Sequence, residues 1–530
     1  MTSQPAAPVA VGVGPLSFAD VVAVARGSAA VELTGEAREA IERARAVVDR
    51  LADQPTPAYG ISTGFGALAT RHIPTEMRAQ LQRSLVRSHA AGSGPEVERE
   101  VVRGLMLLRL STLATGHTGI RLETAELMAA MLSNGVTPVV HEYGSLGCSG
   151  DLAPLAHCAL ALIGEGPVRD REGTLMPAAD ALAAAGLKPV ELAAKEGLAL
   201  INGTDGMLGM LVLALTDLGV LLRTADVAAA MSVEAQLGTD RVFAPELQAI
   251  RPHPGQASSA ANLVALLQDS GVVASHRGPD CNRVQDAYSL RCSPQVHGAA
   301  RDTLEHCAVV AARELASAVD NPVVLDMPVD EEGRQARLET RVESNGNFHG
   351  APVAYVLDFA AIVAADVASI SERRTDRFLD KARSPGLPPF LADDPGVDSG
   401  HMIAQYTQAA IVSEMKRLAA PASVDSIPSS AMQEDHVSMG WSAARKLRRS
   451  VDGLTRVLAV EVLTAARALD LRRPLEPSPA TEAVVRLLRA SGIEGPGPDR
   501  HLAPEIETAV GLVRDGRVVA AVEEVIGELR

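Results

Sequence analysis

The chain has 530 residues, and its 49 Lys and Arg against 65 Asp and Glu give a formal net charge of −16. This acidity argues against nucleic acid or an anionic membrane as a partner, because both select for clustered basic side chains. Hydrophobic residues make up 47% of the chain and aromatic residues only 2%, so the core must be built from Ala, Leu and Val, which favours helices over a β-sandwich.

The first half of the chain alternates between helical periodicity and glycine-rich loops. Helical periodicity covers about 18–48, and a Pro- and Gly-rich segment at 55–66 follows it. Such a segment between helices is typical of a functional loop. The next apolar face repeats every four residues from Met77, and His89 lies on it. A further amphipathic region, 101–132, is interrupted by glycines.

Long helical segments dominate the rest. A glycine loop at 144–150 precedes a helix that opens at Asp151, where an acidic residue suits the helix dipole. Segments rich in Ala and Leu cover about 195–320 and 350–470, and a last helix begins near 504. The sequence therefore predicts a mostly α protein.

Three features favour a reducing cytoplasm. The 5 cysteines include no C-x-x-C pair, which argues against a disulfide framework and a zinc knuckle. Residues 1–16 have no Lys or Arg, so no signal peptide is expected. The most apolar window, 198–222, contains Asp205 and Asp217, so a buried helix is a better interpretation than a membrane span.

The loop Gly-Ser-Leu-Gly-Cys-Ser-Gly-Asp at 144–151 has two interpretations. In the simpler one, Ser149 caps the following helix. In the other, the loop is compressed and the nitrogen of Gly150 attacks the carbonyl of Cys148, an approach that the missing Cβ of glycine permits. Loss of water from the ring and from Ser149 then leaves a methylidene-imidazolone, which is a strong electrophile.

The sequence at 144–157, Gly-Ser-Leu-Gly-Cys-Ser-Gly-Asp-Leu-Ala-Pro-Leu-Ala-His, resembles the signature of the aromatic amino acid ammonia-lyase family. Members of this family form a 4-methylidene-imidazol-5-one (MIO) group from X-Ser-Gly, usually Ala-Ser-Gly. Other segments resemble the family in the same order along the chain, which makes the resemblance specific. They are 59–66, 87–92, 195–204, 285–291, 344–349, 402–407, 413–414 and 433–439.

The resemblance implies a fold, an assembly and a reaction. The fold is a domain at 1–114 that carries the inner active-site loop and a helical bundle at 115–530 that carries the MIO-forming loop. The assembly is a homotetramer whose sites combine residues from three subunits. The resemblance is greatest to the family's histidine-specific members, and it implies conversion of L-histidine to trans-urocanate and ammonia, the first step of histidine degradation. No external cofactor and no metal are implied.

The resemblance gives catalytic roles to five residues. Tyr59 is the base, and because a free phenol has a pKa of about 10, it needs nearby donors or positive charge to act as a phenolate. Cys148, Ser149 and Gly150 form the electrophile, and Tyr288 supports it by hydrogen bonding. Taken alone, Tyr59 is a loop tyrosine that packs on glycines, and Tyr288 is a satisfied polar core residue.

Four residues are implied in binding the substrate's amino-acid part and lining the pocket. Arg291 is the carboxylate clamp, since its planar fork matches a carboxylate. Gln285 and Asn202 supply hydrogen bonds, and Phe348 lines the pocket. Taken alone, an Arg usually forms an ion pair at the surface, while a Gln, an Asn or a Phe in such a segment is usually a core residue.

His89 and Glu414 are the implied contacts of the imidazole ring. His89 is followed by Ala90, as in the histidine-specific lyases, although a histidine on an apolar face is more often a hydrogen-bonded core residue. A carboxylate at Glu414 can pair with an imidazole, although a mid-helix Glu with Lys416 and Arg417 close by normally faces solvent.

The sequence departs from the family pattern at two positions. Cys148 replaces the usual Ala, and Asp205 stands where Gln is common in histidine lyases. The Gly64-x-Gly66-x-x-Ala69 match to a dinucleotide fingerprint lacks a preceding strand, and the sequence contains no H-E-x-x-H. Two alternatives stay open: another MIO enzyme, either an aminomutase or a lyase for a different aromatic amino acid, and a non-catalytic helical scaffold.

Overall fold

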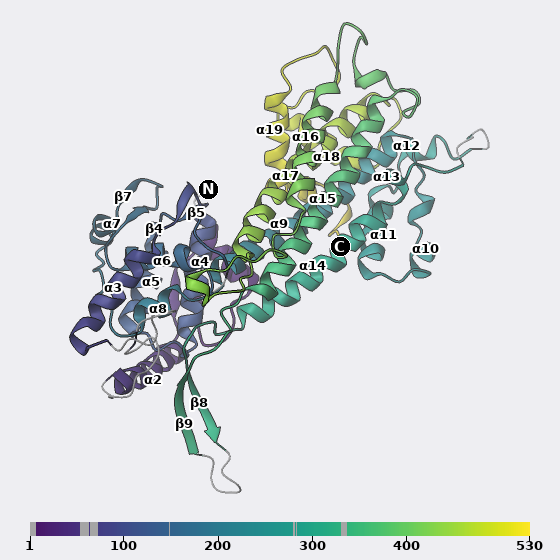
Figure 1. Cartoon of the computed structure of the whole chain (residues 1–530). Helices are drawn as coiled ribbons and strands as arrows, with labels where there is room; N and C mark the ends of the chain where they lie inside the picture. Colours follow the sequence, from purple (N-terminus) through teal and green to yellow (C-terminus); the bar gives the residue numbers. More distant parts are fainter. Residues whose placement is uncertain are drawn as a thin grey trace. The chain divides into compact units, whose positions relative to one another are not determined.

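The computed structural model describes residues 7–52, 63, 73–147, 149–278, 281, 284–329 and 337–530. It is 61% helical, which confirms the mostly α prediction, and it divides into two compact units whose segments alternate along the chain (Figure 1). Unit 1 is Met1–Leu213, Ala308–Leu357 and Pro421–Arg445, and unit 2 is Ala214–Cys307, Asp358–Ala420 and Lys446–Arg530. The predicted boundary between 114 and 115 coincides with the end of a helix, α4, and stays a prediction.

Unit 1 begins with helices whose starts and ends follow local sequence signals. Ser17 and Asp20 form a capping box at the start of the first helix, and Gly135 ends the fifth with φ at 76°. The predicted interruption of the amphipathic region falls between the fourth and fifth helices. The helices are α1 (Phe18–Ala25), α2 (Gly35–Ala52), α3 (Arg78–His89), α4 (Arg99–Ala114), α5 (Leu122–Asn134), α6 (Leu152–Leu162), α7 (Ala178–Ala184) and α8 (Glu196–Ile201).

The strands of unit 1 form four small sheets. β1 and β2 are parallel, β3 pairs antiparallel with β5, and β4, β6 and β7 form a three-stranded sheet. β8 and β9 form an antiparallel hairpin that projects from the unit (Figure 1). The strands are β1 (Val9–Val11), β2 (Val31–Leu33), β3 (Ser93–Glu96), β4 (Thr137–Pro138), β5 (His141–Tyr143), β6 (Pro167–Arg169), β7 (Leu175–Pro177), β8 (Val323–Val329) and β9 (Arg337–Glu343).

Unit 2 is built from helices, four of which also carry residues of unit 1. These four are α9 (Asp205–Ala235), α14 (Ser293–Leu315), α15 (Ala351–Leu379) and α17 (Gly440–Asp470). The others are α10 (Pro245–Ala249), α11 (Pro254–Leu266), α12 (Gly271–Ala274), α13 (Tyr288–Arg291), α16 (Met402–Leu418), α18 (Pro479–Ala490), α19 (Ala503–Arg514) and α20 (Arg517–Ile526).

Buried charge joins the long helices of unit 2. The Glu461 carboxylate on α17 accepts hydrogen bonds from Ser232 on α9 at 2.7 Å and from Ser371 on α15 at 2.5 Å. Arg374 on α15 donates to both of its oxygens, at 2.5 and 2.9 Å. Because a buried charge is tolerated only when it is paired and hydrogen-bonded, these contacts fix the three helices against one another.

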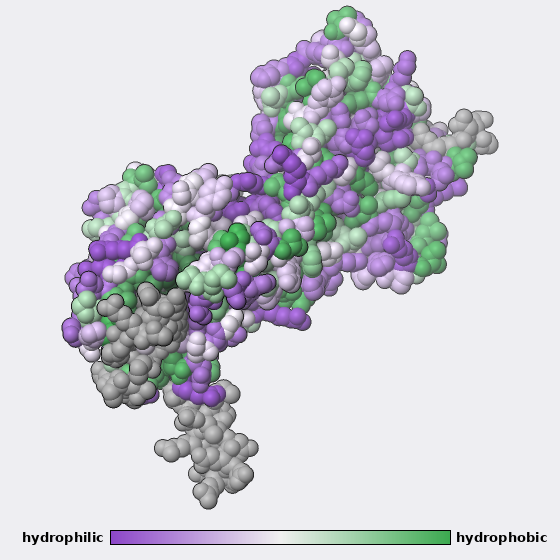
Figure 2. Space-filling model, viewed as in Figure 1, coloured by the Kyte–Doolittle hydropathy of each residue, from purple (hydrophilic) through white to green (hydrophobic). Residues whose placement is uncertain are grey.

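Two long apolar helices are core helices. By length and composition α9 and α15 could cross a membrane, but 78% and 61% of their most apolar windows are buried inside the protein. This agrees with the predicted buried helix at 198–222, with one difference. The apolar window is broken at residues 202–204, so that α8 ends before α9 begins. On the outside, Figure 2 shows hydrophobic residues interspersed with hydrophilic ones over the visible face.

His401, which precedes α16 in unit 2, is a buried histidine with a shifted pKa. It is 2% exposed, and its Nδ1 lies 3.1 Å from the hydroxyl of Thr464. Burial, followed by the positive charges of Arg467 and Arg500, lowers its pKa from 6.5 to about 3. The folded protein therefore resists protonation of this ring, whereas the unfolded chain does not.

We expect this histidine to contribute to acid sensitivity. Because its folded pKa lies below the unfolded value, the stabilisation is complete above about pH 6.5 and declines as the pH falls from there towards 3, by up to about 1.4 kcal/mol per pH unit. Denaturation midpoints measured from pH 7 to pH 4 should fall less steeply for His401→Gln than for the wild type. Parallel slopes would contradict a neutral buried His401.

Candidate active site

The glycine loop at 144–151 is held against the residues between α8 and α9. Gly150 forms a bridge with Gly203, and the backbone nitrogen of Asp151 donates to the Gly203 carbonyl at 2.7 Å. A Cβ atom on Gly150 would lie 1.9 Å from that carbonyl oxygen, and the φ of Gly150 is +77°. Ser149 also lies in the left-handed region, at φ +43°. Position 150 is therefore restricted to glycine.

Asp151 anchors the loop to the start of α9. One carboxylate oxygen accepts from the backbone nitrogens of Gly206 and Met207, both at 2.9 Å, and the other accepts from the Ser145 hydroxyl at 2.8 Å. Burial raises the pKa of this carboxyl to about 7, although the hydrogen bonds oppose the shift. The sequence predicts Asp151 as an acidic residue of its own helix, but its side chain caps α9 instead.

Two other segments hold the same loop: one resembles the family, and the other directly follows a segment that does. The Gly147 carbonyl accepts from the Ser438 hydroxyl at 2.7 Å and from the backbone nitrogen of Gly350 at 3.1 Å. The Met439 nitrogen donates to the Leu146 carbonyl at 2.8 Å. Because the loop is tied on both sides and lacks room for a Cβ at Gly150, its local geometry fits the X-Ser-Gly cyclisation expected from the sequence.

The hydroxyl of Ser149 does not cap the following helix, so the simpler interpretation of this serine is wrong. No side-chain cap is present at the start of α6. Instead, Ser149 Oγ donates to Glu434 Oε1 over a long 3.5 Å contact. The other oxygen of Glu434 accepts from the Ser429 hydroxyl at 2.8 Å. Glu434 is partly buried, so a carboxylate lies beside the loop where the sequence analysis did not assign one.

His89 lies at the C-terminal end of α3, where the charge of the Glu434 carboxylate affects its pKa. Its Nδ1 is 2.9 Å from the Leu85 carbonyl, which places the proton on Nδ1 and leaves Nε2 as the acceptor of the neutral ring. Burial lowers the pKa of His89, while the bond to Leu85 and the negative charge of Glu434 oppose that shift. Ser149 and Glu434 are thus in contact, and the charge of Glu434 acts on His89, with all three residues in unit 1.

Glu434 is the residue that sequence reasoning missed. It lies in the segment 433–439, which resembles the family, but no role was assigned to it. The available signal was a carboxylate within the family-like segment 433–439.

Asn202 and Phe348 also belong to unit 1. Asn202 is 3% exposed, and its Nδ2 donates to the Asn321 carbonyl at 3.0 Å. Its Oδ1 is buried without a hydrogen-bond partner among the residues that the structure describes. Phe348 is partly buried in the segment that contacts the Gly147 carbonyl through Gly350.

The remaining predicted residues lie in unit 2. Gln285 and Tyr288 are exposed, Tyr288 by 73%. The Arg291 guanidinium stacks 4.8 Å from the centre of the Tyr288 ring, and its Nε is buried without a partner among the described residues. Glu414 on α16 is half exposed and pairs with Arg417, which is the ordinary environment of a mid-helix glutamate.

Two predicted residues, Tyr59 and Cys148, lie outside the described residues. Their assignments rest on the sequence resemblance, and they stay predictions. No group of three or more His, Cys, Asp or Glu suited to a metal ion occurs in the described part of the chain.

Comparison with known proteins decides the family. A model of the aromatic amino acid lyase family matches residues 16–490. The chain belongs to the aromatic amino acid lyase family. Its fold is that of the histidine and phenylalanine ammonia-lyases and aminomutases, as the sequence resemblance predicts.

Curated relatives within the family are similar over nearly their full length. The chain is 66% identical to a histidine ammonia-lyase of Streptomyces avermitilis over 521 residues, covering 98% of this chain and 99% of the relative. It is 67% identical to one of Streptomyces griseus over 523 residues, with the same coverage.

Solved structures of the family superimpose over the whole chain. A tyrosine aminomutase from Streptomyces globisporus is 38% identical with a TM-score of 0.90, covering 99% of this chain and 100% of the other. A histidine ammonia-lyase from Trypanosoma cruzi is 38% identical with a TM-score of 0.87, covering 98% and 95%.

Proposed function

We propose that this protein is a histidine ammonia-lyase, a carbon–nitrogen lyase that converts L-histidine to trans-urocanate and ammonia in the cytoplasm. The observation that carries the proposal is the contact of Ser149 with Glu434, whose charge acts on His89, in a chain about two-thirds identical to histidine ammonia-lyases. An imidazole and a carboxylate beside the loop are suited to recognise the imidazole ring of histidine.

The prosthetic group of this reaction would be MIO, formed from Cys148, Ser149 and Gly150. The left-handed backbone of Ser149 and the absence of space at Gly150 fit its formation. When formed, it supplies an electrophile that makes the substrate amine a better leaving group. Asp151, Gly203 and Ser438 would hold the loop that contains it.

The other residues position the substrate and move its β-proton. Tyr59 would remove that proton, and Arg291 would clamp the carboxylate with its guanidinium. Asn202 can accept a hydrogen bond with the oxygen that has no partner among the described residues. Gln285 and Tyr288 would donate or accept at the amino-acid end, and Phe348 would line the pocket.

The imidazole ring is assigned to His89 and Glu434. In the neutral tautomer fixed by Leu85, Nε2 of His89 can accept a hydrogen bond from an imidazole N–H. The Glu434 carboxylate accepts from the second nitrogen when the substrate ring carries a proton there. Glu414, which the resemblance implies for this role, is half exposed and pairs with Arg417 in the single chain, so like Tyr288 it would reach the ring from another subunit.

A second candidate is an aminomutase, which the similarity to the tyrosine aminomutase structure favours. The two reactions differ after the amine leaves the α-carbon. A lyase releases ammonia, whereas an aminomutase returns the amine to the β-carbon. The experiment incubates the protein with L-histidine, L-tyrosine or L-phenylalanine and identifies each product. Urocanate as the main product supports the proposal, and a β-amino acid or an arylacrylate in its place overturns it.

We also propose a homotetramer, because apolar side chains on α15 and a predicted catalytic side chain of unit 2 are exposed. Tyr355, Phe359 and Ile362 follow one another at helical spacing along α15 and are 51%, 43% and 44% exposed. Tyr288, which has a predicted catalytic role, is more exposed still. A side chain in this position is suited to a site that it completes on another subunit.

Sedimentation should therefore report four chains. We expect Phe359→Glu to shift the protein to smaller species and to lower histidine turnover, because a buried unpaired carboxylate opposes the contact. A wild-type protein that sediments as one chain and is active would contradict the assembly, without touching the assignment of the reaction.

A further inference from the structure

A buried lysine and a buried aspartate lie outside every role assigned above. Lys195 Nζ is 2.6 Å from Asp320 Oδ2, and both side chains are 0% exposed. Burial lowers the pKa of the Lys195 ammonium, and the Asp320 carboxylate opposes that shift by favouring the charged form. Removing two charges from water costs several kcal/mol per ion, so the pair needs an explanation beyond packing.

The pair is located at one end of a short helix whose other end carries a site residue. Lys195 precedes α8, and Asn202 follows it. Lys195 has a φ of +70°, a conformation that costs a non-glycine residue free energy. The two ends of α8 are thus held by two consecutive residues, because Lys195 pairs with Asp320 and Asn202 donates to the Asn321 carbonyl at 3.0 Å.

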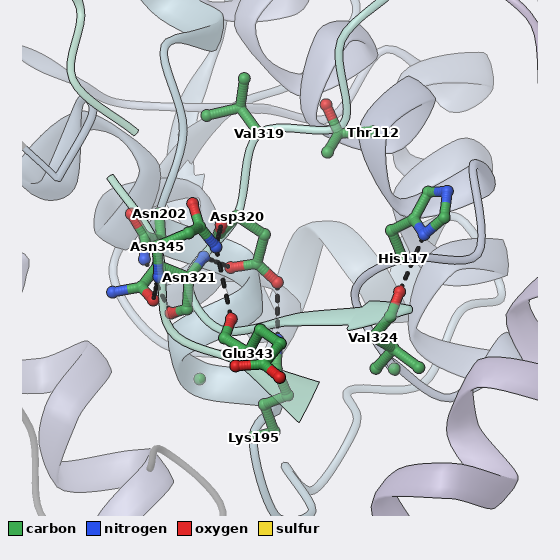
Figure 3. A network of polar contacts seen from close by, with 12 residues as sticks. Thr112, His117, Lys195, Asn202, Val319, Asp320, Asn321, Val324, Glu343 and Asn345 are labelled. Atoms are coloured by element: carbon green, nitrogen blue, oxygen red, sulfur yellow. Dashed lines mark hydrogen bonds and ion pairs between the residues drawn. The ribbon is translucent and has the colours of Figure 1, made fainter. Parts of the chain in front are cut away.

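Asp320 also sets the position of its neighbour. The second oxygen of its carboxylate accepts from the backbone nitrogen of Asn321 at 2.7 Å. Arg109, which is fully buried, links the two segments. Its guanidinium donates to the Asn202 carbonyl at 2.5 Å and to the carbonyl of Val319, which precedes Asp320, at 2.8 Å. Figure 3 shows the contacts that run from Lys195 through Asp320 and Asn321 to Asn202.

Asp320 and Asn321 also hold the segment that contains Phe348. The side-chain oxygen of Asn321 accepts from the Ser344 hydroxyl and the Asn345 nitrogen, both at 3.0 Å. The Asn345 amide donates to the Asp320 carbonyl at 3.0 Å. That segment continues to Gly350, which contacts the Gly147 carbonyl of the glycine loop.

We propose that Lys195 and Asp320 are positioning residues for the reaction: their ion pair fixes both ends of α8 and thereby aims the side-chain oxygen of Asn202 at the substrate. Neither residue touches the reacting atoms. The inference rests on the proposed function, since it assigns Asn202 a part in that site. A misplacement of about 1 Å in such a group can lower turnover about 100-fold.

The test separates positioning from stability by neutralising the pair. Lys195→Met and Asp320→Asn alone should each melt at lower temperature, because each leaves one buried charge unpaired. The double variant K195M/D320N removes both charges and keeps an oxygen for the Asn321 nitrogen, so it should melt close to the wild type. We expect its kcat for L-histidine to fall about 10- to 100-fold while KM changes less than about threefold.

Two measurements make this result specific. Intact mass gives the fraction of chains that have lost water, and kcat is expressed per modified chain. The matched control is K446M/D358N, which neutralises a Lys–Asp pair of unit 2 whose aspartate is buried and whose lysine is partly buried, and it should keep the wild-type kcat.

A double variant with wild-type kcat per modified chain would overturn the positioning role and leave the proposed function intact. No urocanate from the wild type would overturn the proposed function itself. Should the double variant fail to fold, Asp320→Glu is the second test. It keeps both charges but displaces the carboxylate by one methylene, so kcat should still fall at similar KM, and an unchanged kcat would overturn the inference.

Discussion

Ser149→Ala is expected to abolish histidine turnover while leaving the fold intact. Alanine has no hydroxyl to lose as water, so the methylidene carbon of the electrophile cannot form. The side chain of Ser149 makes only a long contact with Glu434, so the substitution removes little packing. We expect turnover to fall at least ~1,000-fold, measured as urocanate formed per chain, with a melting temperature near that of the wild type.

The control for this prediction is the mass of the protein. The wild-type chain should be lighter than its sequence by two molecules of water, one from ring formation and one from the serine. The Ser149→Ala chain should lack the loss from the serine. Turnover at the wild-type rate, or a wild-type mass equal to the unmodified sequence, would refute the assignment of the loop.

Glu434→Ala is expected to lower kcat/KM for L-histidine about 10- to 100-fold, as loss of a charged hydrogen-bond partner does. Its carboxylate lies beside Ser149 and raises the pKa of His89 against the effect of burial. Glu434→Gln should give a smaller loss, because it keeps the shape and removes only the charge. Kinetics with L-histidine and melting temperatures measure both.

Glu414→Ala is the matched comparison. This glutamate is half exposed beside Arg417, and exposed pairs of this kind contribute little to stability. We expect its kcat/KM for L-histidine to fall about 10- to 100-fold, because the resemblance gives this carboxylate the imidazole ring of a site on another subunit, while the melting temperature stays near that of the wild type. Normal kinetics in Glu434→Ala would remove Glu434 from the site, and normal kinetics in Glu414→Ala would remove Glu414.

The helical fold follows from local signals in the sequence. Ala- and Leu-rich periodicity predicts the long helices, the capping box at Ser17 marks the first of them, and the glycines after Ala114 separate α4 from α5. The place of His89 on α3 also follows from the four-residue spacing. Each of these features depends on residues close together in the chain.

Contacts across the chain could not be predicted in the same way. Asp151 caps α9, whose start is more than fifty residues away, and not its own helix. Glu434 meets Ser149 over a separation of 285 residues, which no local pattern encodes. The sequence resemblance supplied the segments that converge on the loop, but only the packing of those segments reveals the contact between Glu434 and Ser149.

The Lys195–Asp320 pair could not be predicted from local sequence patterns either. In the sequence, Lys195 is one lysine within a family segment, and Asp320 is part of a turn before a proline. Their separation of 125 residues hides the ion pair. The role inferred for it depends on Asn202 lying at the far end of a six-residue helix, and that is a property of the fold.

The fate of the amine nitrogen distinguishes a lyase from an aminomutase. The purified protein, with no added cofactor, is incubated with L-histidine labelled with ¹⁵N in its α-amino group. We expect trans-urocanate and labelled ammonium in equal amounts. Label retained in a β-amino acid, or no release of label, would contradict it.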